Sequence, residues 1–102
     1  MAKKLTIESA SRLLADVPPD KVFYVFNGPL LKNLEELKKC LESINDETFA
    51  YHRSHIKNDF YNWVLFVVGD ARLANDIARC KTGLTTLKKV KERVEALKKI
   101  KG

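Results

Sequence analysis

The residues best suited to chemistry lie in one short stretch, Phe49–Trp63, which contains both histidines of the chain. Phe49, His52 and Ile56 fall on one face of the helix predicted there, so His52 is expected to point toward the core. A buried imidazole needs a hydrogen-bond partner, and Asp59, at the start of the next predicted helix, can supply a carboxylate. An Asp–His pair also occurs in nucleophilic triads, but no serine or cysteine of the chain lies in a nucleophile motif. The pattern therefore favours a structural pair over catalysis or ligand contact.

A metal site built from these residues would combine His52, His55 and Asp59, with Cys40 or Cys80 added. Zinc sites usually contain ligand pairs at short spacing, such as Cys-x-x-Cys, and neither cysteine has such a partner. Each cysteine lies beside the apolar face of its predicted helix, where a free thiol behaves as a small hydrophobic group. We therefore predict two free thiols and no bound metal.

Phosphate-binding loops are not indicated by the glycines of the chain. Gly28 lies in an Asn-Gly-Pro turn and Gly83 stands alone, so neither belongs to a glycine-rich loop that could hold a nucleotide. No cofactor is predicted, and the sequence does not indicate an enzyme.

A spaced pattern runs through the same region: Phe-x-x-His, then Asn-Asp-Phe-x-x-Trp, then Gly-Asp-x-x-Leu-Ala. Its positions in this chain are Phe49, His52, Asn58, Asp59, Phe60, Trp63, Gly69, Asp70, Leu73 and Ala74. With the upstream Phe-Tyr-Val-Phe segment and the helix containing Leu34 and Leu37, residues 20 to 80 resemble a small archaeal-type domain family of unknown function. The resemblance implies an accessory domain, alone or attached to a larger protein, and it implies no activity.

The chain departs from that family pattern in two places. Leu65 and Phe66 are apolar where the family tends to be polar, and the basic helix after residue 80 is an extension. Most of the pattern also has a structural explanation. Asn58 and Asp70 are expected N-caps, each contributing about 1 kcal/mol, and Gly69 suits the left-handed end of a helix.

Length and composition predict one domain, 1–102, since 45% of the residues are hydrophobic and a chain of this size supports one core. The longest strongly apolar run, Phe60–Val68, is far shorter than the ~20 residues that a transmembrane helix needs. No long hydrophobic stretch follows the basic start, Met1–Leu5, so we expect a cytoplasmic protein without membrane contact.

Helical periodicity predicts an all-α fold, a small bundle or orthogonal array of about five to six helices. The expected helices are 6–14, 30–44, 47–53, 60–68, 71–80 and 84–100. Thr6 is the expected N-cap of the first, and Pro29 is expected in the first turn of the second. Residues 22–26 are expected to be extended, without a second strand to pair with.

The predicted helix at 60–68 has two apolar faces. Its second face consists of Tyr61, Leu65, Phe66 and Val68. One explanation is a central helix that is covered on both sides, the second side by residues 84–100. The other is an interface with a partner or with a second copy, because large exposed apolar patches usually mark interfaces.

The formal net charge of +6 is concentrated at the ends of the chain. Residues 1–4 contribute +2 and the amphipathic C-terminal segment 84–102 contributes +5, whereas the helical body, 5–83, has a net charge of −1. The bases that could contact a polyanion are Lys3, Lys4, Lys88, Lys89, Lys91, Arg93, Lys98, Lys99 and Lys101. No aromatic residues alternate with the C-terminal bases, so a nucleic acid would be bound through its backbone and not through its sequence. A solvated helix face is the alternative explanation of these lysines.

These patterns together predict a non-enzymatic interaction or accessory module that binds a protein partner or associates with itself. The alternative is a small basic protein that binds RNA or DNA through its charged ends. The first hypothesis depends on the second apolar face at 60–68, and the second depends on the terminal bases.

Overall fold

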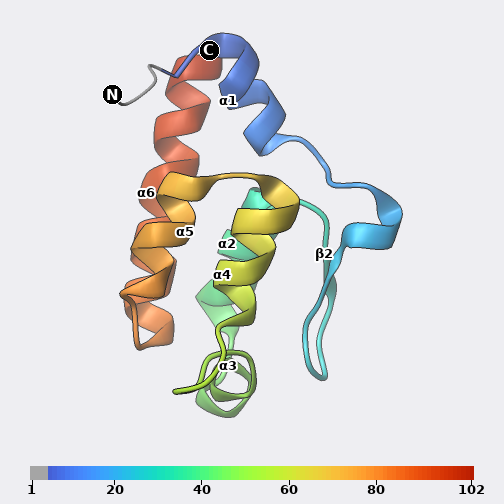
Figure 1. The fold of residues 1–102 in the computed structure, drawn as a ribbon, viewed down its shortest axis with the longest axis vertical. Helices are drawn as coiled ribbons and strands as arrows, with labels where there is room; N and C mark the ends of the chain where they lie inside the picture. The colour runs from blue at the N-terminus through green and yellow to red at the C-terminus, as the bar shows by residue number, and fades with distance from the viewer. Residues whose placement is uncertain (1–4) are drawn as a thin grey trace.

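A computed structural model describes residues 5–102, and the predicted contacts of Lys3 and Lys4 lie outside these residues. The described chain consists of helices and one small antiparallel sheet, which confirms the predicted helical fold class (Figure 1). In chain order the elements are α1 (Ile7–Leu14), the 3₁₀ turn η1 (Pro19–Lys21), β1 (Phe23–Tyr24), β2 (Leu30–Leu31), α2 (Leu34–Ser43), α3 (Asp46–His52), α4 (Asp59–Trp63), the π-helix η2 (Val64–Val68), α5 (Ala71–Ala78) and α6 (Gly83–Lys101).

Each α-helix begins after a polar side chain that accepts a hydrogen bond from a backbone N–H of the first turn. These N-cap residues are Thr6, Asn33, Asn45, Asn58, Asp70 and Thr82. The predicted caps Thr6, Asn58 and Asp70 are therefore confirmed. Apart from α2, the helix boundaries differ from the predicted ones by no more than is usual for frayed helix ends.

The prediction of an isolated strand is wrong, because β1 and β2 form a short antiparallel hairpin. Phe23 lies opposite Leu31, and Tyr24 lies opposite Leu30. The turn contains Asn27 at a φ of 54°, in the left-handed region that asparagine tolerates better than most residues. The hairpin projects from the helices at one edge of the molecule (Figure 1).

The predicted start of the second helix at Leu30 is also wrong. Pro29 lies in the hairpin turn, where its carbonyl accepts the N–H of Val25 (3.2 Å), and α2 begins only after Asn33. The Asn33 side chain accepts the N–H of Glu36 (2.8 Å) and so ends the extended segment. Leucines at the observed spacing suit a long helix and also a strand followed by a helix, so the periodicity did not distinguish the two.

The helix α4 continues directly into the π-helix η2, and the two form one rod in which every residue after Asp59 is uncharged. Gly69 ends the rod at a φ of 85°, as predicted, and the N–H groups of Gly69 and Asp70 both donate to the carbonyl of Val64 (2.9 and 3.0 Å). A π-helix is rare because its wide turn packs poorly along its own axis, and it is found disproportionately at functional sites.

The C-terminal helix α6 is part of the core and packs chiefly along α1 and α2, with α5 as a further neighbour (Figure 1). Its side chains Val90, Val94 and Leu97 are fully buried in the same apolar cluster as Phe60 of α4. The predicted cover of the second apolar face of residues 60–68 by α6 is incomplete, because Phe66 stays 76% exposed. Within residues 5–102, no helix combines the length and the apolar character required to cross a bilayer.

Candidate functional site

The aromatic ring of Phe23, on β1, is enclosed by three rings from the α3–α4 region. Its centroid lies 4.9 Å from that of His52, 5.3 Å from that of Phe60 and 5.8 Å from that of Trp63. The rings of Phe23 and Phe60 are stacked, and Phe49 stacks on Phe60 in turn at 5.5 Å. The hairpin is therefore attached to the helices by a buried aromatic cluster, which contributes contact area and favourable ring geometry.

Two side chains of the same pattern also hydrogen-bond the backbone that flanks β1. The N–H of Phe26 donates to Nε2 of His52 (3.0 Å), and Nε1–H of Trp63 donates to the carbonyl of Lys21 (2.8 Å). Both bonds satisfy backbone groups that lie outside the two-residue strands, one before β1 and one after it. We call this arrangement the hairpin clamp: Phe23 in its aromatic cluster, with His52 and Trp63 holding the backbone on either side of it.

The predicted contact between His52 and Asp59 is present, with Nδ1 of the imidazole 2.9 Å from Oδ2 of the carboxylate. His52 is only 3% exposed. Because the N–H of Phe26 can only donate, Nε2 must carry the lone pair, and the ring proton must be on Nδ1, which donates it to Asp59. Both ring nitrogens are thus occupied by hydrogen bonds within the fold, and neither is available to bind a metal.

The remaining candidates for metal or nucleophilic chemistry are dispersed. Among the described residues, no three His, Cys, Asp or Glu side chains lie close enough together to hold a metal ion. Cys40 and Cys80 are free thiols. Burial raises the pKa of the Cys40 thiol, and Cys80 donates its hydrogen to the carbonyl of Asp76 (3.3 Å), so neither is presented as an activated nucleophile.

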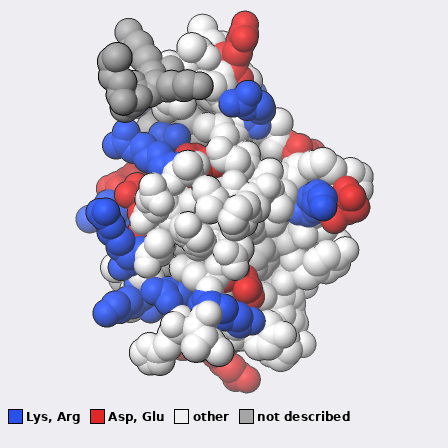
Figure 2. Space-filling view, in the orientation of Figure 1, with Lys and Arg blue, Asp and Glu red and all other residues white. Residues whose placement is uncertain are grey.

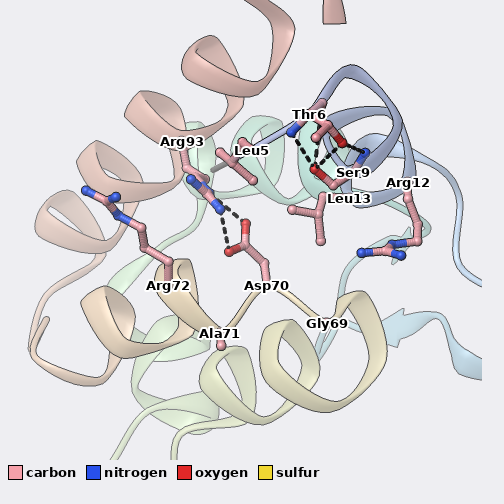
Figure 3. Close-up of a pocket in the computed structure, with 10 residues that line it drawn as sticks. All are labelled: Leu5, Thr6, Ser9, Arg12, Leu13, Gly69, Asp70, Ala71, Arg72 and Arg93. Carbon is pink, nitrogen blue, oxygen red and sulfur yellow. Dashed lines mark hydrogen bonds and ion pairs between the residues drawn. The ribbon is translucent and has the colours of Figure 1, made fainter. Parts of the chain in front are cut away.

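Asp70 has a larger role than the predicted N-cap. Its Oδ1 accepts the N–H of Leu73 (3.1 Å), and its carboxylate also binds Arg93 of α6 through Nε (2.8 Å) and Nη2 (2.9 Å). Asp70 is 2% exposed, so this two-point ion pair is largely removed from water. The guanidinium of Arg93, predicted as a nucleic-acid contact, instead joins α6 to the start of α5 in this structure (Figure 3), and its contact with nucleic acid stays a prediction.

The ion pair borders a groove of about 610 Å³ between the N-terminal ends of α1 and α5 (Figure 3). Arg12 and Arg72 also line the groove, and both are exposed. The hydroxyl groups of Thr6 and Ser9 at the rim bond to each other and to the first turn of α1. The polar groups of this groove are thus mostly occupied in capping and pairing.

Two other basic side chains of α6 also lie close to acidic side chains. Nζ of Lys98 lies 2.7 Å from Oε1 of Glu35 on α2, and Nζ of Lys89 lies 3.9 Å from Oε1 of Glu92. The hydrogen bond from Lys98 is the main reason that the pKa of Glu35 is lowered, with Lys38 adding to the effect and burial opposing it.

Four predicted bases of α6 have no ion pair among the described residues, and all four are exposed: Lys88, Lys91, Lys99 and Lys101. Helical spacing places Glu92 and Glu95 on the same side as Lys88 and Lys99, since these positions differ by four or seven. The outer surface of α6 is therefore a mixed surface and not a continuous positive track.

The second apolar face of α4 and η2 is exposed at Phe66 and half-buried elsewhere. Phe66 is 76% exposed, whereas Tyr61, Leu65 and Val68 are partly covered by the core, and together they form the outer apolar face. The segment 60–69 contains no charged residue. Figure 2 shows a surface without Lys, Arg, Asp or Glu at the centre of the view, where α4 and η2 face the reader.

One exposed aromatic contact was not predicted. Phe26 of the hairpin stacks on Tyr51 of α3 with centroids 4.3 Å apart, and Nζ of Lys57 lies 4.5 Å from the centroid of the Tyr51 ring. Nothing near Tyr51 in the sequence identifies Phe26 as its neighbour, because the contact depends on how the hairpin folds onto α3.

The sequence matches no protein-family model and has no significant match among curated proteins or solved structures. The resemblance to an archaeal-type domain family stays a prediction, and function is argued below from the chain itself.

Proposed function

We propose that this protein is a non-enzymatic interaction module that associates with a second copy of itself through the outer apolar face. The observation that carries the proposal is Phe66, which projects 76% of its surface into solvent from a segment without charged residues. A large aromatic ring exposed within an uncharged apolar surface favours a partner that covers it.

The π-helix supports a functional role for this face. The wide turn of η2 positions Phe66 on the outside while Val64 in the same element is fully buried. Because π-helices are less favourable than α-helices, their presence commonly marks a position where function outweighs packing.

The charge distribution favours a second copy of this chain as the partner at the outer apolar face. Two molecules that each carry a net charge of +6 repel each other, and the repulsion is smallest where both surfaces are uncharged. A symmetric dimer brings the same patch of each copy together, so one uncharged apolar face is sufficient for both sides. A different protein with an apolar patch is the competing occupant.

The location that we propose is the cytoplasm. Its support is limited to the two free thiols, which suit a reducing compartment. The absence of an enzymatic role is likewise part of the proposal, and its support is that His52 is fully engaged in the hairpin clamp.

Sedimentation velocity over a wide concentration range tests the proposal. The wild-type protein should show a reversible monomer–dimer equilibrium, and Phe66→Glu should shift it strongly toward monomer because a charge would be buried at the interface. Ile56→Glu is the matched control, since Ile56 is 94% exposed and lies in the loop between α3 and α4. A wild-type protein that stays monomeric, or a dimer that Ile56→Glu disrupts as strongly as Phe66→Glu, would contradict the proposal.

A further inference from the structure

A second surface with a distinct chemistry lies where α3, the loop after it, the end of α5 and the start of α6 meet. It contains two shallow grooves, of about 370 and 460 Å³, which share Lys81. The cationic side chains that line them are Arg53, Arg79, Lys81 and Lys89. We call this surface the basic band. Figure 2 shows Lys and Arg side chains running across the lower part of the molecule in this region.

Few acids balance the cations of the basic band, although Nζ of Lys89 lies 3.9 Å from Oε1 of Glu92. Asp76 is the one acidic residue among those lining the two grooves. Arg79 and Lys81 are exposed and make no ion pair with any described residue. The band is thus more uniformly positive than the outer surface of α6, where glutamates alternate with lysines.

Arg53 is fixed in place by the fold. Its guanidinium donates to the carbonyls of Cys80 (3.1 Å) and Ala78 (3.5 Å) at the end of α5 and to the carbonyl of Ser54 (2.6 Å). These acceptors carry only the partial negative charge of carbonyls near a helix end, so Arg53 is held at the groove without a carboxylate partner.

The loop between α3 and α4 connects the basic band with the exposed aromatic pair of Phe26 and Tyr51. His55 lines one groove, and Lys57 on the same loop lies over the ring of Tyr51. Phe26 and Tyr51 are stacked with an interplanar angle of 14° and are 39% and 50% exposed. Partly exposed aromatic rings near cationic side chains are the combination that proteins use to bind single strands, with phosphates on the cations and a base on a ring.

We propose that the basic band and the Phe26–Tyr51 pair bind single-stranded nucleic acid. Arg79 and Lys81 contact successive phosphates, and an unpaired base stacks on the aromatic pair. The ammonium of Lys57 leaves the ring of Tyr51 for a phosphate when the base arrives. Binding tolerates many sequences, because phosphates and base faces are shared by all nucleotides. The site is separate from the outer apolar face, so it does not depend on self-association.

The competing occupant is an acidic protein segment, which would use the cations but not the aromatic pair. Tyr51 therefore distinguishes the two classes. Tyr51→Ala should weaken a single strand and leave an acidic peptide unaffected, whereas neutralising Arg79 and Lys81 should weaken both.

Fluorescence anisotropy with labelled oligouridine, oligothymidine and a DNA duplex of equal length provides the test. We expect the two single strands to bind alike and more tightly than the duplex. Arg79→Gln with Lys81→Gln should lower the affinity about tenfold at low salt and reduce the slope of log K against log salt by about 1.4, for two lost phosphate contacts. Tyr51→Ala should lower the affinity about tenfold with an unchanged slope, and Tyr51→Phe should bind like the wild type.

The matched control is Lys88→Gln with Lys99→Gln, which removes the same charge from the outer surface of α6. It should change the affinity less than about twofold, because a non-contacting charge acts only through screened long-range attraction. Equal weakening by this control, unchanged binding of Tyr51→Ala, full displacement by oligoglutamate or no binding at low salt would each overturn the proposal. Far-UV circular dichroism of every variant confirms that the fold is retained.

Discussion

Two elements have outward surfaces that the sequence predicts to bind a partner: the rod formed by α4 and η2, and the helix α6. They differ in what their outward side chains contact within the fold. The inner side of the rod holds the hairpin through Phe23, and its outer side leaves Phe66 uncovered. The inner side of α6 fills the core, and several of its bases pair with acids of the chain through Asp70, Glu35 and Glu92. Charged side chains on a small domain readily find partners within it, whereas an apolar side chain on the outer surface does not. What sets Phe66 apart from exposed apolar residues such as Ile56 is the uncharged apolar surface around it, which indicates an external partner.

The largest expected effect separates the two sides of the rod. Phe60→Ala should lower the free energy of unfolding by about 3–5 kcal/mol, because Phe60 is fully buried between Phe23 and Phe49. Phe66→Ala should change it by less than about 0.5 kcal/mol, since the ring lies mostly in water. Urea titrations followed by circular dichroism, at a protein concentration low enough for monomers, measure both. Similar losses for the two variants would show that Phe66 belongs to the core.

The second prediction separates the paired from the unpaired bases of α6. Arg93→Ala should destabilise the protein by about 2–3 kcal/mol, because the buried carboxylate of Asp70 would lose its counter-charge. Lys99→Ala should have almost no effect, because its side chain is exposed. A double variant, Arg93→Ala with Asp70→Asn, should recover part of the loss, because the unpaired charge is gone. Equal stability of the two single variants in thermal melts would refute the assigned role of Arg93.

The smallest expected effect concerns the contact between α6 and α2. Lys98 lowers the pKa of Glu35 in the folded state, so folding and ionisation of Glu35 favour each other. The stabilisation should be fully present above the ordinary glutamate pKa of 4.5 and lost as the pH falls through the lowered value. Its size should be less than about 1 kcal/mol, because the pair is partly exposed. Glu35→Gln should show a shallower loss of stability in acid than the wild type, and identical acid profiles would contradict the contribution of this pair.

The sequence predicted those structural features that depend on residues close together in the chain. The caps Thr6, Asn58 and Asp70 act within one turn, and Gly69 acts on its own backbone. The contact between His52 and Asp59 spans seven residues and was predicted from helix geometry.

The sequence did not predict the contacts between residues that lie far apart in the chain. The two backbone bonds of the hairpin clamp span 26 and 42 residues, and the pair between Asp70 and Arg93 spans 23. Asp70 has an adequate local explanation as a cap, so nothing in its neighbourhood indicates a second partner. The hairpin itself was missed because its strands are two residues long, too short to show an alternating pattern.

The hairpin clamp also determines which positions of the chain are free to vary during evolution. His52 and Trp63 bind the N–H of residue 26 and the carbonyl of residue 21, and every amino acid except proline offers both groups. The clamp bonds therefore place no demand on the side chains at those two backbone positions, although Phe26 also stacks on Tyr51, whereas His52 and Trp63 have few substitutes of matching shape and hydrogen bonding. Distant relatives should keep the pair of clamping side chains and an aromatic residue in place of Phe23, while the surrounding hairpin diverges.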